Sequence, residues 1–301
     1  TTPSDTKIYD GKALTKSEGA KLEGLVNNET ATLNVTGSQT EVGKSTNTYE
    51  IAWDGTAVST NYKVTTEDLG TLEVTAKGID PDPENPNALT YEGPVDTVYN
   101  GTSQKQPVVI TDPETGKTLV EGTDYTITYS EDTTNVGTVT VTIEGKGNYS
   151  GTYEPTYKIT PAPLTVTTPS DTKIYDGKAL TKSEGATFEG LVNNETATFE
   201  VTGSQTAVGT STNTYKITWD STAKESNYAA PTETLGELKV TAKDIDPDPE
   251  DPKALTYEGP EDTVYNGTSQ KQPVVITDPE TKQPLVEGTD YTITYSEDTT
   301  N

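Results

Sequence analysis

The chain repeats itself at a fixed distance, and this constrains its fold more than any other feature. The segment TTPSDTKIYDGKAL at residues 1–14 returns at residues 167–180, and the offset of 166 residues (167 minus 1) holds without a gap to Asn301. Self-similarity at a long period is typical of tandem arrays, in which small units follow one another and contact only their neighbours. The first copy continues over residues 136–161, which have no counterpart in the second, so we expect a window from a longer array.

Each period divides again into two related halves, which we call A and B. Both halves carry a Tyr-Asp-Gly or Tyr-Asn-Gly turn, then a Val-Gly pair before an alternating segment, then an Asn-Tyr corner. These landmarks predict four modules in the order A1, B1, A2 and B2, the last of them incomplete. Their expected bounds are residues 1–77, 78–162, 163–243 and 244–301.

The composition favours β-strands. Only 29% of the residues are hydrophobic and the formal net charge is -27, which leans toward disorder, but 17 tyrosines among many Thr and Val suit half-buried strands. Polar and apolar residues alternate with period two in residues 47–53, 123–130 and 137–145. We therefore expect an all-β fold of small β-sandwich-like modules, with one minor helical turn at most, at residues 14–24.

The junctions between modules are rich in proline. Residues 79–87 (IDPDPENPN) recur as residues 245–253, and residues 159–166 (ITPAPLTV) join B1 to A2. Proline favours stiff, extended linkers. Because a strand of about 10 residues spans roughly 33 Å, four modules end to end predict an elongated rod on the order of 130 Å.

Charge and composition exclude several classes of function. Strong acidity disfavours a non-specific grip on nucleic acid and docking on anionic membranes. The chain has no Cys, Met or His, so disulfides, thiolate chemistry and the usual general base are missing. No apolar run reaches membrane-spanning length. We therefore predict that the protein is not an enzyme, with no catalytic residue, no cofactor, no nucleic-acid partner and no membrane insertion in this segment.

The acidic junctions are candidates for calcium, because carboxylate oxygens at domain joints can bind this ion. The residues are Asp80, Asp82 and Glu84, with the same types at residues 246, 248 and 250. Rigid proline hinders wrapping six or more oxygens around one ion. The sequence therefore favours a solvated stiff spacer and no metal site.

The tyrosines allow two interpretations. They are either an exposed aromatic ladder for sugars or the core of each module. Alternating strand positions favour the core, as at Tyr125 and Tyr157. Trp53 and Trp219 occupy equivalent positions and are expected to anchor the two A cores.

The motifs TKIYDGKAL, TVYNGTSQ and GKGNYSGTYEPTYKITPAPLTV together resemble the MBG/YDG-type Ig-like repeats of bacterial, often Gram-positive, surface adhesins. The resemblance covers all four modules. It implies Ig-like β-sandwich modules, with a β-grasp-like variant as the alternative. It also implies an extracellular stalk at the cell surface, which projects a binding tip and is anchored to the cell wall through a region not present here.

A covalent Lys–Asn crosslink of the kind that strengthens Gram-positive stalks would join Lys7 to Asn61 in half A. Half B has Thr97 at the place of the lysine. The sequence therefore favours Lys7 as a surface strand residue whose aliphatic stem packs along its neighbours.

The function that we expect is that of structural stalk or spacer repeats of a bacterial surface adhesin or fibre. The expected partners are neighbouring repeats of the same chain and, through an absent tip domain, a host glycan or protein. One alternative is a multivalent array that binds host glycan or mucin. Another is a surface filament that assembles by strand exchange.

Overall fold

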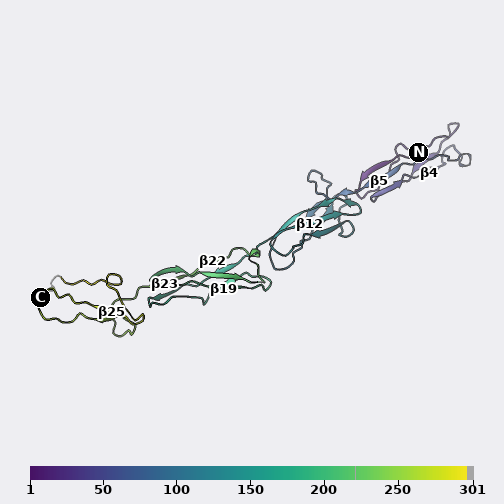
Figure 1. Cartoon of the computed structure of the whole chain (residues 1–301). Helices are drawn as coiled ribbons and strands as arrows, with labels where there is room; N and C mark the ends of the chain where they lie inside the picture. Colours follow the sequence, from purple (N-terminus) through teal and green to yellow (C-terminus); the bar gives the residue numbers. More distant parts are fainter. Residues whose placement is uncertain (221, 297–301) are drawn as a thin grey trace. The chain divides into compact units, whose positions relative to one another are not determined.

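The computed structural model describes residues 1–220 and 222–296, and the chain divides into two compact units, Thr1–Pro161 and Ala162–Asn301. Each unit contains one A and one B segment; β4, β5 and β12 in Figure 1 belong to the first unit and β19, β22, β23 and β25 to the second. The expected boundaries at residues 77/78 and 243/244 fall inside these units, and the four-module division stays a prediction.

The fold is all-β, as predicted. Apart from two 3₁₀ turns, η1 (Ser59–Asn61) and η2 (Glu225–Asn227), the regular structure of the described residues consists of strands in several sheets. The predicted strand at residues 137–145 is β12 (Gly137–Gly145), and those at residues 123–130 and 47–53 contain β11 (Tyr125–Tyr129) and β4 (Tyr49–Ala52).

Segment A of the first unit contains two small sheets. In the first, β5 (Thr71–Thr75) lies between β1 (Asp5–Ile8), to which it is parallel, and β3 (Gly43–Thr46), to which it is antiparallel. In the second, β2 (Thr32–Val35) pairs with β4 in antiparallel register. Alternation in β5 buries Leu72 and Val74 completely, so these two side chains form the centre of a small core.

Segment B of the first unit has a larger core. Its main sheet has the order β11-β12-β15-β8, with a short strand also paired to β12, and a second sheet has the order β10-β9-β7. Alternate residues Val139, Val141 and Ile143 of β12 are buried, as are Tyr157 and Ile159 on the neighbouring strand. The strands not bounded above are β7 (Thr90–Glu92), β8 (Thr97–Val98), β9 (Val109–Asp112), β10 (Lys117–Thr118), β14 (Thr152–Tyr153) and β15 (Thr156–Thr160).

A short parallel pair joins the two segments. β6 (Lys77–Gly78) spans the boundary between the two segments and pairs with β13 (Tyr149–Ser150) near the end of segment B. The chain is therefore hydrogen-bonded to a strand of segment B at the point where it leaves segment A.

The second unit repeats the A sheet as β17-β23-β20 and the antiparallel pair as β19-β21, and adds a sheet of order β18-β16-β22. Its B segment contains the sheet β24-β25-β26. The strands are β16 (Thr165–Thr167), β17 (Asp171–Ile174), β18 (Thr187–Glu189), β19 (Ala197–Val201), β20 (Gly209–Thr212), β21 (Tyr215–Trp219), β22 (Thr232–Thr234), β23 (Glu237–Thr241), β24 (Thr256–Glu258), β25 (Val275–Asp278) and β26 (Gln283–Pro284).

The helical turn expected at residues 14–24 is wrong. Leu14 instead forms an isolated antiparallel bridge with Gln39. Gly19 and Gly24 have φ values of 92° and 97°, which no right-handed helix accommodates. The short helical turn lies at the Asn-Tyr corner of segment A, where Asn61 ends η1.

Asn47 is a buried strut inside segment A. Its side chain is inaccessible to solvent, and Nδ2 donates to the carbonyl oxygens of Pro3 and Lys16, each at 2.8 Å. The hydroxyl of Thr2 donates to the carbonyl oxygen of Asn47 at 2.6 Å. Asn213 makes the same amide bonds in the second unit, to Pro169 and Lys182. One side chain thus ties the start of the segment and the loop after β1 to its core.

We expect Asn47→Asp to destabilise the first unit by about 2–4 kcal/mol, because the aspartate has no N–H to donate and places a charge against two buried carbonyl oxygens. Trp53 stacks on Tyr62 in this unit, so its fluorescence in a Trp219→Phe background reports chemical unfolding there. Asn34→Asp on the exposed side of β2 is the control and should change the midpoint little. An equal loss from both variants would show that Asn47 is no strut.

Candidate functional site

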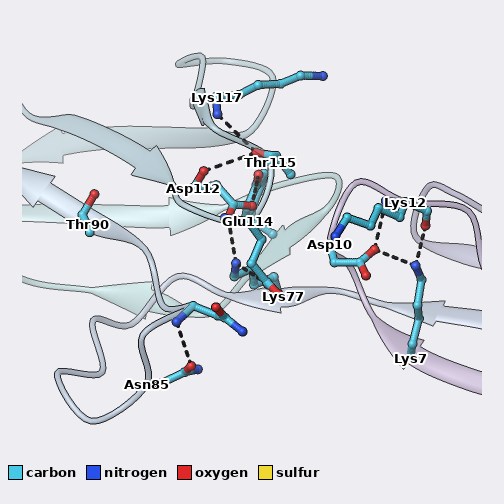
Figure 2. Close-up of polar contacts among 12 residues, drawn as sticks. Lys7, Asp10, Lys12, Lys77, Asn85, Thr90, Asp112, Glu114, Thr115 and Lys117 are labelled. Atoms are coloured by element: carbon cyan, nitrogen blue, oxygen red, sulfur yellow. Dashed lines mark hydrogen bonds and ion pairs between the residues drawn. The ribbon is translucent and has the colours of Figure 1, made fainter.

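The joint between segments A and B contains a buried lysine. The side chain of Lys77 is 7% exposed, and its Nζ lies 2.7 Å from Asp112 Oδ1 and 2.8 Å from Glu114 Oε2. Figure 2 shows the ammonium group directly facing both carboxylates, which come from the end of β9 and the loop after it. The Lys77 N–H donates to the carbonyl oxygen of Asn148, so the backbone holds the lysine in this position.

Asp112 is buried because of the period of its strand. Ile110 and Asp112 lie two residues apart in β9 and face the same side, and both are 0% exposed. Oδ1 of Asp112 also accepts the Glu114 N–H at 3.0 Å, and Oδ2 accepts the Tyr149 hydroxyl at 3.0 Å. Three donors therefore compensate the cost of burying this carboxylate.

The charges of this cluster set its protonation. Burial alone lowers the pKa of Lys77, but its hydrogen bonds to Asp112 and Glu114 outweigh burial, and the net pKa is raised. Burial and the hydrogen bond to Asp112 raise the pKa of the Tyr149 hydroxyl well above its ordinary value. At neutral pH Lys77 is thus a charged ammonium group, and Tyr149 stays protonated as a donor.

The Tyr-Asp-Gly turn of segment A packs against this cluster. The rings of Tyr9 and Tyr149 meet edge to face, with centroids 5.8 Å apart at 77°. Gly11 has a φ of 73°, and a Cβ at this position would lie 2.7 Å from Thr115 Cγ2. Only glycine fits this close approach at this backbone angle without a shift of its neighbour. The turn is therefore the docking element of segment A on the Asp112 loop.

A second contact joins the other landmarks of the repeat. The N–H of Val42, in the Val-Gly pair of segment A, donates to Asn148 Oδ1 at 2.9 Å. The amide of Asn148, in the Asn-Tyr corner of segment B, donates to Glu41. The joint thus combines an ion cluster, an aromatic contact and a polar clasp.

The second unit repeats the ion cluster and the close approach of the turn. Lys243 Nζ lies 2.8 Å from Asp278 Oδ1 and 3.0 Å from Glu280 Oε2. A Cβ on Gly177 would lie 2.6 Å from Thr281 Cγ2. Burial raises the pKa of Asp278, but the bond from Lys243 and backbone N–H groups outweigh it, and the net pKa is lowered.

The sequence-based candidates lie elsewhere. Asp82 Oδ1 accepts the Glu84 N–H at 3.1 Å in a turn of the junction, and no three acidic side chains within the described residues could together hold a metal ion. Lys7 Nζ binds Asp10 Oδ1 at 2.6 Å and the carbonyl oxygen of Lys12, and none of its described contacts is with Asn61. The Lys7–Asn61 crosslink is therefore not the pairing that this structure brings together.

The aromatic side chains are mainly internal. Tyr125 and Tyr157 are 6% and 1% exposed, as the core interpretation predicted. Trp53 is half-buried and stacks on Tyr62 with centroids 5.7 Å apart, and Trp219 stacks on Tyr228 at 5.5 Å. Each tryptophan thus lies in a stacked pair at the side of its A segment and does not fill the centre of the core.

Sequence reasoning missed the lysine cluster. A signal was present, because the last residue of the alternating segment VVITD is acidic and stands at a core-facing position, and Pro-Glu-Thr follows it in both copies. The partner lysine carried no local signal, since it lies 35 residues away from Asp112.

Comparison with known proteins adds no family. No protein-family model matches the chain, and no curated protein matches it in sequence. Within the described residues, no helix is both long enough and apolar enough to cross a membrane.

We expect Gly11→Ala to loosen the joint, because the added methyl meets Thr115. Gly19→Ala is the matched control, since Gly19 also has a positive φ but would have no atom within 4 Å of its Cβ. Hydrogen exchange of the Lys77 and Ile79 amides, which bond to the carbonyl oxygens of Asn148 and Ser150, measures the effect. Gly11→Ala should accelerate it roughly tenfold, equivalent to about 1.4 kcal/mol. Equal rates in both variants would contradict this role.

Proposed function

We propose that the chain consists of structural spacer repeats of an extracellular bacterial surface protein, which carry load and hold a binding tip away from the cell. The observation that carries this proposal is a parallel pair between an early strand and the last strand, found in both A segments and in segment B of the first unit. The Ig-like sandwich architecture and the arrangement of the modules as a rod are part of the proposal.

The register of these strands fixes where the chain enters and leaves a segment. In segment A of the first unit, Asp5 pairs with Leu72 and Ile8 with Thr75. The chain therefore enters at one end of this strand pair and leaves at the other. In the second unit β17 and β23 are parallel in the same way, and in segment B of the first unit β8 and β15 are parallel. In these two segments β16 precedes β17 and β7 precedes β8, so the chain reaches the pair through one further strand.

This geometry resists extension. Hydrogen bonds between strands run across the strand direction, so tension applied at the two ends of a parallel terminal pair shears all of them together. Tension on an antiparallel pair from one end breaks the bonds one after another. A parallel terminal pair thus suits a protein that transmits force along its chain.

The surface is compatible with an extended spacer. A net charge of -27 makes the chain repel itself and stay soluble. The joint described above holds each B segment against the A segment that precedes it, so neighbouring repeats of the same chain are the partners that we propose.

The two alternatives gain no specific support. A multivalent glycan array needs an aromatic patch shared by the modules. In the described part of the chain, the exposed large aromatic side chains are Tyr265 and Tyr295, and Tyr99, the counterpart of Tyr265, is 4% exposed. Among the residues that the structure describes, no particular contact favours strand exchange between chains.

Single-molecule force spectroscopy tests the load-bearing role. We expect a chain pulled from its two termini to unfold its A segments at several-fold higher force than the β2–β4 pair when that pair is pulled apart. The second geometry uses handles at Asn34→Cys and Glu50→Cys, an opposed pair on these strands in a chain without natural cysteine. Similar forces in the two geometries would overturn the proposal.

Small-angle scattering tests the spacer. Four modules in single file predict a maximum dimension on the order of 130 Å. Because we propose no structural metal, a chelator should leave this dimension unchanged. A compact particle, or one whose dimension changes with chelator, would contradict a metal-independent rod.

A further inference from the structure

We propose that Lys77 and Asp112 form an intramolecular amide bond, with Glu114 as the group that promotes it, and that Lys243, Asp278 and Glu280 form a second site of the same kind. The bond would join Lys77 Nζ to Asp112 Cγ. The proposal does not depend on the spacer function, because it concerns the chemistry of the joint alone.

The first argument is position. Nζ of Lys77 lies 2.7 Å from an oxygen of the carboxyl group that it would attack, and the backbone pairing of β6 with β13 holds it there. Holding two reacting groups together in this way raises their effective concentration to roughly 10⁵–10⁸ M. Amine and carboxyl groups that do not condense in dilute solution can therefore do so here.

The second argument is burial. The exposed fractions of the Lys77 and Asp112 side chains are 7% and 0%. Asp112 and Glu114 keep the Lys77 ammonium charged at rest, so the reactive neutral amine and carboxylic acid form only when a proton passes from Nζ to Asp112. A low-dielectric site lowers the cost of this transfer, because it replaces two charges with none. It also excludes the water that would hydrolyse the product. The amide removes both buried charges at once.

The third argument is the second carboxylate. Glu114 Oε2 lies 2.8 Å from the same Nζ and is 27% exposed, so it can hold a proton in transit. Tyr149 donates its hydroxyl to Asp112 Oδ2 at 3.0 Å. That donor is placed to stabilise negative charge on the oxygen when the carbon becomes tetrahedral.

The atoms balance without any oxidant or added reactant. The Lys77 ammonium passes a proton to the Asp112 carboxylate, which leaves a neutral amine and a carboxylic acid. The nitrogen lone pair attacks Cγ, and Glu114 takes a second proton from the nitrogen and delivers it to the departing hydroxyl group. The carbon–oxygen bond breaks, water leaves, and an uncharged amide remains.

The chain offers an internal comparison. Lys7 and Asp10 form an equally short pair at 2.6 Å, but their side chains are 21% and 27% exposed. The partners of Lys7 Nζ are this carboxylate and a backbone carbonyl oxygen, with no second carboxylate among its described contacts. We expect no bond at this pair.

Mass spectrometry of the whole 301-residue chain tests the proposal. In a Lys243→Arg background, the folded chain should be lighter than its sequence mass by one water. Trypsin should not cleave after the acylated Lys77, so the digest should contain a branched peptide that joins Lys77 to Asp112. The branched peptide is decisive, because Asp-Gly sequences elsewhere can also lose water by cyclisation. Asp112 cannot do so with the following residue, since Pro113 has no N–H.

Three variants separate the roles. Lys77→Arg in the same background keeps the charge but should restore the full mass. Glu114→Gln keeps the size of the side chain and should slow bond formation after refolding by roughly 10²–10⁴-fold, the range for loss of a general acid–base group. Lys7→Arg should leave the branched peptide unchanged.

The outcomes are distinct. A branched Lys77–Asp112 peptide in the folded chain, absent after Lys77→Arg, supports the amide. Complete cleavage after Lys77 in the folded parent chain overturns it and leaves a simple ion pair, whatever the force measurements show. Bond formation at an unchanged rate in Glu114→Gln overturns the role of Glu114.

Discussion

The buried Lys77 is the interaction on which the joint between the segments depends. The groups around it depend on one another. The Asp112 carboxylate can occupy a fully buried position because Lys77, Tyr149 and a backbone N–H donate hydrogen bonds to it. Removing one partner of a buried ion pair typically costs about 3–5 kcal/mol, because the other charge stays buried without compensation. The cluster therefore acts as one unit, and segment A and segment B are coupled through it.

This coupling matters because the individual cores are small. In segment A of the first unit the fully buried centre is little more than Leu72 and Val74, and a domain of that size buries too little apolar surface to be stable by a wide margin. The Tyr9–Tyr149 contact and the close approach of Gly11 to Thr115 extend packing across the joint. The Tyr-Asp-Gly turn, which marks every repeat, is thus in segment A the surface that meets the next segment.

Local rules predicted much of this fold. Alternation in residues 137–145 gave a strand with the correct bounds, and each Gly of the Tyr-Asp/Asn-Gly turns has the positive φ expected of a tight turn. The helical turn at residues 14–24 failed because two glycines there adopt left-handed angles. The lysine cluster escaped prediction for a different reason. Which residue faces Asp112 depends on the register of β6 with β13, and that register is set by tertiary packing between residues far apart in sequence.

The two copies of segment B show where the constraint lies. Over residues 79–135 and 245–301 they differ at six positions, and all six residues of the first copy are exposed: Asn85, Asn87, Val95, Gly116, Lys117 and Thr118. The turn tip beside the joint even exchanges Gly116 for Lys282, which keeps a left-handed φ of 57°. One difference adds an ion pair to the cluster of the second unit: Lys253 stands in place of Asn87, and its Nζ lies 3.5 Å from Glu280 Oε1. Residues at the tip of this turn thus differ between the copies, even where the substitution strains the backbone. The lysine, both carboxylates and the threonine that contacts the glycine turn are the same in both copies. A surface selected for a ligand at the tip would show the opposite distribution.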